Sequence, residues 1–313
     1  MAQIQSKYEY MARVLIAGGS GFIGRALVAA LIARGDRVTV LTRGEAGMRD
    51  GVPHQHWDPR PGTSAVFSEV YDAVVNLSGE QAVGVRYSES VKAGILNSRV
   101  DTTHWLVRAI EHAEQKPKVF VCASGTGIYG STLSSARLDE SAPAGDDFLA
   151  MVCVAWEAAA QTAEQFGVRV VRARTAPVLS EKGGALDSLL RPFKLFVGGP
   201  IGTGKQGFPW IHLDDQIAAL LRACDDSALN GPVNFCAPEP ISNGELSRII
   251  AELLGRPAFV KAPAFALKAL FGGGADPLLG GQFAVPRALE RVGFEFKYSD
   301  VRSALTAILR DAS

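Results

Sequence analysis

The chain has 313 residues, which is enough to bury a substantial core as one large domain or as a main domain with a smaller lobe. Its formal net charge is zero and it has no basic tract, which argues against nucleic acid and anionic membranes as partners. No apolar run is long enough to cross a membrane and residues 1–10 lack the apolar core of a signal peptide, so we expect a cytoplasmic protein.

The first regular unit follows residues 1–10, which we expect to be a leader or an edge segment. Four apolar residues predict a buried strand, three glycines follow at a spacing of three, and an Ala/Leu-rich helix begins at once. In this context Gly18 permits a tight turn, Gly21 lets the backbone approach a pyrophosphate, and Gly24 lets the helix pack on the strand. The helix N-terminus would face the phosphates. The predicted cofactor contacts are Gly18, Ser20, Gly21, Phe22, Ile23 and Gly24; a glycine turn without a ligand is the alternative.

The second predicted strand, residues 37–42, ends next to Arg43, nineteen residues after Gly24. A protein specific for NAD places Asp or Glu here to bind the ribose 2′-hydroxyl, whereas an arginine accommodates the 2′-phosphate of NADP. The guanidinium presents several donors in a fork that suits phosphate. We therefore expect NADP(H), with an ordinary solvated arginine as the alternative.

Two later strands are predicted to end in small and polar residues. Residues 71–79 run from a strand into a loop at the edge of the sheet where a cofactor would cross. The candidate cofactor contacts in this loop are Asn76, Leu77, Ser78 and Gly79. Residues 119–123 form the next strand, and a segment with Ser124, Thr126 and Tyr129 follows it.

The remaining elements complete the predicted sheet and add a lobe. Helices are expected at 88–115 and 148–166, and a further strand at 168–174. Residues 180–208 are rich in glycine and predict loops. A helix over 216–224 with Asp214 or Asp215 as its cap, a strand over 232–236 and a helix opened by Ser242 follow. Four cysteines without a C-x-x-C pair predict reduced thiols, and we expect no metal site.

This alternation of strands and helices predicts an α/β fold, a Rossmann-like doubly wound parallel sheet with a smaller C-terminal α+β lobe. The expected dinucleotide-binding domain spans residues 11–178 and is completed by about 208–238. Residues 179–207 and 239–313 would form the smaller lobe, which closes over the cofactor.

Several segments together resemble the extended branch of the short-chain dehydrogenase/reductase superfamily, and in particular its epimerase-family subgroup. They include Gly18–Gly24, Asn76–Glu80, Ser98-Arg99, Trp156-Glu157, Arg191–Phe193, Gly204–Gln206, Trp210–Asp215 and Gly281-Gln282. The resemblance implies a Rossmann-like domain that binds NADP(H). It also implies that Ser124, or else Thr126, hydrogen-bonds the reacting oxygen of a substrate.

One departure from this family concerns catalysis. Its active members use Tyr-x-x-x-Lys, in which the lysine lowers the pKa of the tyrosine. None of the six tyrosines here has a lysine four residues on, and the expected helix carries Cys153 and Glu157, or Val152 and Trp156, at that spacing. We expect Glu157 to accept hydrogen bonds from ribose hydroxyls. Cys153 is one candidate proton donor, with a small buried hydrophobic residue as the alternative interpretation of it, and Tyr129 is a second candidate donor.

Two functions follow from these residues. The first is an NADP(H)-dependent oxidoreductase or epimerase acting on a small polar substrate, a sugar nucleotide among the candidates. The second is a non-catalytic NADP(H)-binding sensor or scaffold, which the missing Tyr/Lys pair favours. In either case the chain is expected to be a monomer or a homodimer.

Overall fold

The computed structural model describes residues 11–58, 67–181 and 183–311, in which the main sheet has eight strands. All neighbouring strands are parallel except β3, which is antiparallel to β4. The parallel strands follow the Rossmann-like order, so the predicted fold class is confirmed. In sheet order the strands are β12 (Gly231–Phe235), β8 (Arg169–Thr175), β6 (Val119–Gly125), β5 (Ala73–Asn76), β1 (Arg13–Ala17), β2 (Arg37–Thr42), β4 (Val52–His56) and β3 (Gly47–Arg49).

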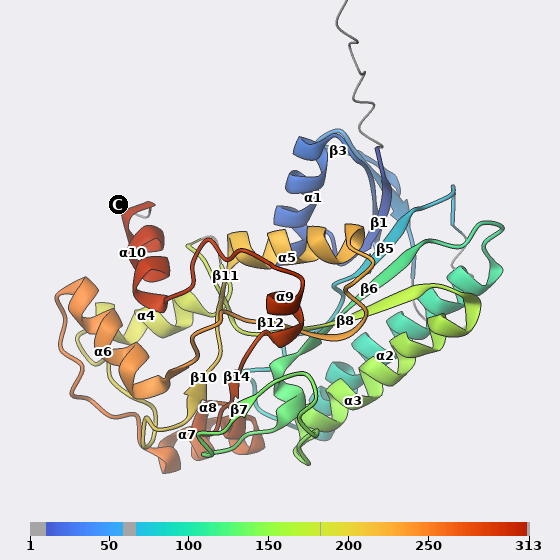
Figure 1. Cartoon of the computed structure of the whole chain (residues 1–313). Helices are drawn as coiled ribbons and strands as arrows, with labels where there is room; N and C mark the ends of the chain where they lie inside the picture. The colour runs from blue at the N-terminus through green and yellow to red at the C-terminus, as the bar shows by residue number, and fades with distance from the viewer. Residues whose placement is uncertain (1–10, 59–66, 182, 312–313) are drawn as a thin grey trace, which may run out of the picture.

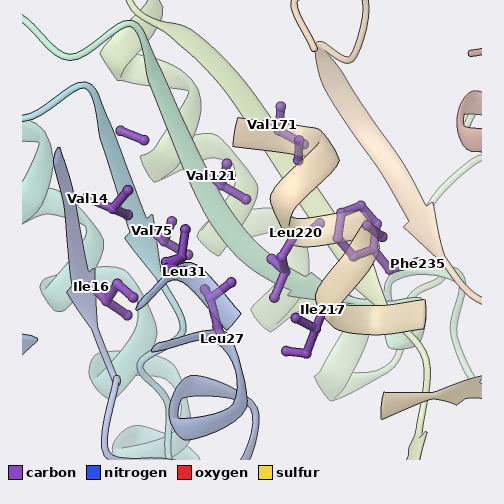
Figure 2. Packing of buried hydrophobic residues seen from close by; sticks show 14 of the residues in the cluster. Val14, Ile16, Leu27, Leu31, Val75, Val121, Val171, Ile217, Leu220 and Phe235 are labelled. Carbon is purple, nitrogen blue, oxygen red and sulfur yellow. The ribbon is translucent and has the colours of Figure 1, made fainter. Parts of the chain in front are cut away.

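Helices cover both faces of this sheet (Figure 1). Side chains alternate along each strand, so Val14 and Ile16 of β1 face one layer while Leu15 and Ala17 face the other. The first layer is α1 (Phe22–Arg34) with α5 (Leu213–Asp225), and the second is α2 (Glu89–His112) with α3 (Phe148–Gln161). Figure 2 shows Leu27 and Leu31 of α1 and Ile217 and Leu220 of α5 over the sheet.

A second apolar core lies beside the sheet and is built from α4 (Leu186–Lys194), α6 (Asn243–Leu254) and α10 (Val301–Asp311). Three short strand pairs join this part to the rest: β7 (Arg137–Leu138) with β14 (Phe283–Ala284), β9 (Val178–Leu179) with β11 (Ile211–His212), and β10 (Gly207–Phe208) with β13 (Ile241–Ser242). The remaining elements are η1 (Thr126–Tyr129), η2 (Thr162–Phe166), α7 (Ala264–Phe271), η3 (Gly272–Ala275), α8 (Asp276–Leu279) and α9 (Arg287–Arg291).

Two local predictions are wrong. Helix α4 lies inside the stretch 180–208, which was expected to be loops, because Leu186, Leu190 and Phe193 bury one apolar stripe despite the flanking glycines. The cap of α5 is His212, whose ring accepts a hydrogen bond from the Asp214 amide; neither aspartate caps the helix. In the part of the chain that the structure describes, no helix is both long and apolar enough to span a bilayer.

Candidate functional site

The turn between β1 and α1 is packed too tightly for any residue but glycine at two positions. Gly18 has φ of 79°, and a Cβ there would lie 2.7 Å from the Leu77 carbonyl carbon of the loop after β5. At Gly24 a Cβ would lie 2.2 Å from the Gly18 oxygen. The two loops at the switch point of the sheet are therefore in contact, and α1 begins directly behind them.

The N-terminus of α1 differs in its capping from the other long helices. Side chains cap α2, α3, α5 and α6, whereas the Gly21 N-cap of α1 has none and the first turn holds no acidic residue. A Cβ at Gly21 would meet only the Gly18 oxygen, at 3.2 Å, so the space in front of this helix end is open. The backbone N–H groups of the first turn and the open space together fit a phosphate group. Phe22 and Ile23 belong to this first turn, and Ser20 is exposed beside it.

Arg43 directly follows β2, at the same edge of the sheet as the turn after β1. Its side chain is exposed and, within the described residues, forms no ion pair. Val40 of the same strand lies beneath the turn, since a Cβ on Gly19 would lie 2.8 Å from a Val40 methyl. The guanidinium is thus free to meet an anion beside the turn.

The loop after β5 is held in shape from below by Asn76. This side chain is fully buried, donates to Thr103 Oγ1 over 3.0 Å, and accepts from the Ser78 amide over 3.1 Å. The Leu77 amide donates to the Ala17 oxygen at the end of β1. Ser78 is partly exposed and Gly79 is exposed. The structure therefore places Ser78 and Gly79 where a ligand can reach them and uses Asn76 as their support.

Arg99 of α2 also lies at this loop, and we did not predict a role for it beyond its place in the resemblance. Its guanidinium donates to the backbone oxygen of Glu80 over 2.8 Å, lies above the Trp156 ring, and would be 3.0 Å from a Cβ on Gly79. Burial lowers its pKa, opposed by Cys153, Glu80 and Tyr87. The signal in the sequence is its place four residues after buried Ile95, on the inward face of the helix.

At the end of β6, Ser124 belongs to a buried polar network. Its hydroxyl donates to Glu157 Oε1 over 2.8 Å, and Arg174 donates to both oxygens of the same carboxylate, at 2.8 Å and 3.0 Å. Glu157 is 5% exposed and Arg174 7%. Burial lowers the pKa of Arg174, but its hydrogen bonds to Glu157 and the carboxylate charge outweigh that effect and raise it. Both carboxylate oxygens are thus engaged, and the predicted contact of Glu157 with ribose hydroxyls stays a prediction.

Tyr129 closes the far end of this network. Its hydroxyl donates to Asn234 Oδ1 over 2.7 Å and accepts from Arg174 over 3.0 Å. Burial raises the pKa of Tyr129 to about 12, although the charge of Arg174 opposes the rise. Asn234 in turn donates to the backbone oxygens of Leu138, in β7, and of Val285, directly after β14.

Cys153 of α3 is a further ionisable group near the end of β6. Its sulfur would lie 3.7 Å from a Cβ on Gly125, the residue after Ser124. Burial raises the pKa of this thiol to about 11, and the charge of Glu157 adds to the rise. Thr126 is buried at the start of η1. A thiol and a phenol of such high pKa are poor proton donors near neutral pH.

The C-terminal part of the chain covers the loop that follows Gly79. A Cβ at Gly274 would lie 2.0 Å from the Val85 oxygen, and Arg86 donates to the Ala269 oxygen of α7 over 3.3 Å. Among the described residues there is no group of three His, Cys, Asp or Glu side chains arranged to hold a metal ion.

Comparison with known proteins assigns this arrangement to a family. The family model described as "NAD dependent epimerase/dehydratase family" matches residues 14–235, and a domain of unknown function, DUF1731, matches residues 262–308. The chain belongs to the NAD-dependent epimerase/dehydratase family. An epimerase family protein SDR39U1 homolog, chloroplastic, from Arabidopsis thaliana is 37% identical over 99% of this chain and 90% of its own length.

Two solved structures agree with this family assignment. The human epimerase family protein SDR39U1 (isoform 2) with NADPH is 37% identical, has a TM-score of 0.86, and is matched over 96% of this chain and 99% of that one. A nucleoside-diphosphate sugar epimerase from Corynebacterium glutamicum is 33% identical with a TM-score of 0.78, over 96% of this chain and 58% of that one. The predicted membership of the epimerase-family subgroup is confirmed.

Proposed function

We propose that this epimerase-family protein binds NADP(H) across the β1–α1 turn and the loop after β5. The observation that carries the proposal is the uncapped N-terminus of α1 behind the open space at Gly21. Arg43, exposed and without an ion pair in the described part of the chain, would hold the 2′-phosphate. The human SDR39U1 structure with NADPH supports the same cofactor.

Ser78, Gly79 and Arg99 would line the path of the dinucleotide toward Ser124. The bound cofactor would supply or accept a hydride, and the chain's own groups would place the substrate oxygen. The packing of α7 and η3 over the loop that ends at Tyr87 supports a C-terminal lobe that covers this site.

The hydrogen bond from Ser124 to Glu157 indicates what kind of substrate group fits. Because the Ser124 hydroxyl donates its proton to the Glu157 carboxylate, which also pairs with Arg174, the serine oxygen offers lone pairs to a ligand. A substrate hydroxyl is the complementary donor. This supports an oxidoreductase or epimerase that acts on a polar, hydroxyl-bearing compound such as a sugar.

A second candidate function is NADP(H) binding without turnover. It is favoured by the raised pKa values of Tyr129 and Cys153, to about 12 and about 11, which leave both groups poor proton donors. In this role the bound dinucleotide would set the shape of the loops that a partner contacts.

The experiment that separates the two incubates the protein and NADPH or NADP with carbonyl compounds, polyols and sugar nucleotides. It follows absorbance of the reduced nicotinamide for a net oxidation or reduction, and chromatography of the products for an epimerisation, which returns the hydride and leaves the absorbance unchanged. Turnover that falls by about a hundredfold or more in Ser124→Ala supports the enzyme. Exposed Ser90→Ala serves as the matched control. Tight NADPH binding with no turnover on any compound supports the second candidate, and absence of binding contradicts both.

The four cysteines Cys122, Cys153, Cys224 and Cys236 are all free thiols. Reduced cysteines support a reducing compartment such as the cytoplasm, which is our proposal for this chain.

A further inference from the structure

Two segments of the chain contain basic residues and no acidic ones. Residues 188–213 and residues 253–275 each carry three basic residues, which leaves the rest of this neutral chain with six more acids than bases. All six side chains are exposed, and none forms an ion pair with another described residue. They are Arg191, Lys194, Lys205, Arg256, Lys261 and Lys268. The zero net charge is therefore an average over a strongly uneven distribution, and it does not argue against an anionic membrane at the surface of these two segments.

These two segments run side by side in the fold. The Val260 amide donates to the Gly198 oxygen over 3.3 Å, and the Ala262 amide donates to the Pro200 oxygen over 3.1 Å. The backbones approach so closely that a Cβ on Gly199 would lie 2.3 Å from the Val260 oxygen. The stretches around residues 198–200 and 260–262 consequently belong to one region of the surface.

Large apolar side chains project from the same region. Among the described residues, fourteen large hydrophobic side chains are exposed, and seven of them come from these two segments. Leu195 is 65% exposed, Phe196 54% and Phe259 77%. We call Leu195, Phe196, Val197, Phe259 and Val260, together with Arg191, Lys194, Arg256 and Lys261, the basic apolar face.

The backbone at Phe196 holds one of these rings outward. Phe196 follows α4 in the left-handed conformation, with φ of 62°, and its amide bonds the Phe193 oxygen. Glycine occupies the left-handed position after α1 and after α6, at Gly35 and Gly255. A phenylalanine there bears backbone strain that a glycine would not. Its ring lies 4.2 Å from the Arg256 guanidinium, so an exposed aromatic ring and a cation are presented together.

We propose that the basic apolar face docks this protein peripherally on an anionic phospholipid surface. The lysine and arginine side chains would meet lipid phosphates, and the rings of Phe196 and Phe259 would enter the interfacial layer, as in proteins that lie on membranes without crossing them. This inference goes beyond NADP(H) binding and does not depend on it.

Charge argues against a second copy of this chain as the occupant of the face, and the exposure of its rings argues against an acidic protein. A second copy of the chain would bring like charges together at a two-fold interface. An acidic protein would satisfy the cations, but rings that are 54% and 77% exposed protrude, and a lipid surface accepts protruding rings without a complementary groove. The face therefore favours the bilayer.

Co-sedimentation with phosphatidylcholine vesicles, with and without phosphatidylglycerol, tests the proposal. We expect binding to the anionic vesicles alone, weakened at least about tenfold by high salt. Lys194→Glu with Lys261→Glu, and separately Phe259→Ser, should each reduce binding by about tenfold or more. The matched controls Arg37→Glu with Lys116→Glu, and Met48→Ser at a side chain 66% exposed, should bind as the wild type does.

Four results would overturn the proposal. They are no binding to anionic vesicles by folded protein, equal binding to neutral vesicles, test variants that behave as the controls, and self-association in sedimentation velocity that Phe259→Ser abolishes. If the first of these results is accompanied by binding to poly-glutamate, it would point to an acidic protein.

Discussion

Asp214 and Asp215 are neighbours in the first turn of α5 and have different surroundings. Asp215 is 2% exposed, and its two oxygens accept the backbone amides of Lys297 and Tyr298, at 2.7 Å and 3.0 Å. Asp214 forms an exposed ion pair with the Lys297 ammonium at 2.7 Å. The buried carboxylate thus anchors the segment that leads into α10, whereas the exposed one adds a pair of little energetic value.

We expect Asp215→Ala to lower the free energy of unfolding by about 2–4 kcal/mol, because two amides lose their acceptor. Asp214→Ala, the matched control, should cost less than about 1 kcal/mol. Urea denaturation measures both, and faster amide exchange across Val301–Asp311 in the Asp215 variant would locate the effect. Equal losses in the two variants would contradict this assignment.

The sequence could not distinguish these two aspartates. Both precede a helix, so a cap is the natural expectation, and only the fold brings residues 297–298 to this place. The network around Ser124 likewise could not be predicted, because only the fold brings its residues together. Its members come from β6, η1, α3, β8 and β12, and their proximity depends on sheet order and not on local pattern.

At the scale of elements, the β1–turn–α1 unit and several element boundaries agree with the sequence prediction. Strand β2 has the bounds expected from its β-branched run, Ser242 caps α6 as expected, and Gly167 ends the α3–η2 stretch. These features depend on neighbours in sequence, which is why pattern alone finds them. Helix α4 was missed because flanking glycines and Pro192 outweighed its short apolar stripe.

Substitutions of Gly21 and Gly24 should have opposite effects, the first on NADPH binding and the second on stability. Gly21→Val should abolish NADPH binding while costing at most about 1 kcal/mol of stability, since a Cβ there meets one atom at 3.2 Å and otherwise enters the open space. Gly24→Ala should lower the free energy of unfolding by about 1–3 kcal/mol, because its Cβ would overlap the Gly18 oxygen at 2.2 Å. Thermal unfolding and fluorescence titration with NADPH report the two effects. Undiminished binding in Gly21→Val would contradict the proposed site.

At the scale of the whole molecule, one chain of contacts joins the two halves of the candidate site. Ser124 bonds Glu157, Arg174 bridges Glu157 to Tyr129, and Asn234 continues to the β7–β14 pair. A polar network is buried between the sheet and the C-terminal part, and its carboxylate, Glu157, comes from α3, the helix in which the family pattern led us to look for a Tyr-x-x-x-Lys pair. The fold class followed from the alternation of strands and helices, whereas this network is visible only in three dimensions.

The central claim is that the first strand–turn–helix unit binds a dinucleotide that carries a 2′-phosphate. Isothermal titration calorimetry with NADPH and NADH, on folded protein freed of bound ligand, tests it most directly. We predict that NADPH binds about 10–100 times more tightly than NADH, that Arg43→Ala removes this preference, and that Arg37→Ala, at the start of the same strand, retains it. No heat with NADPH, or a preference that survives in Arg43→Ala, would contradict the account.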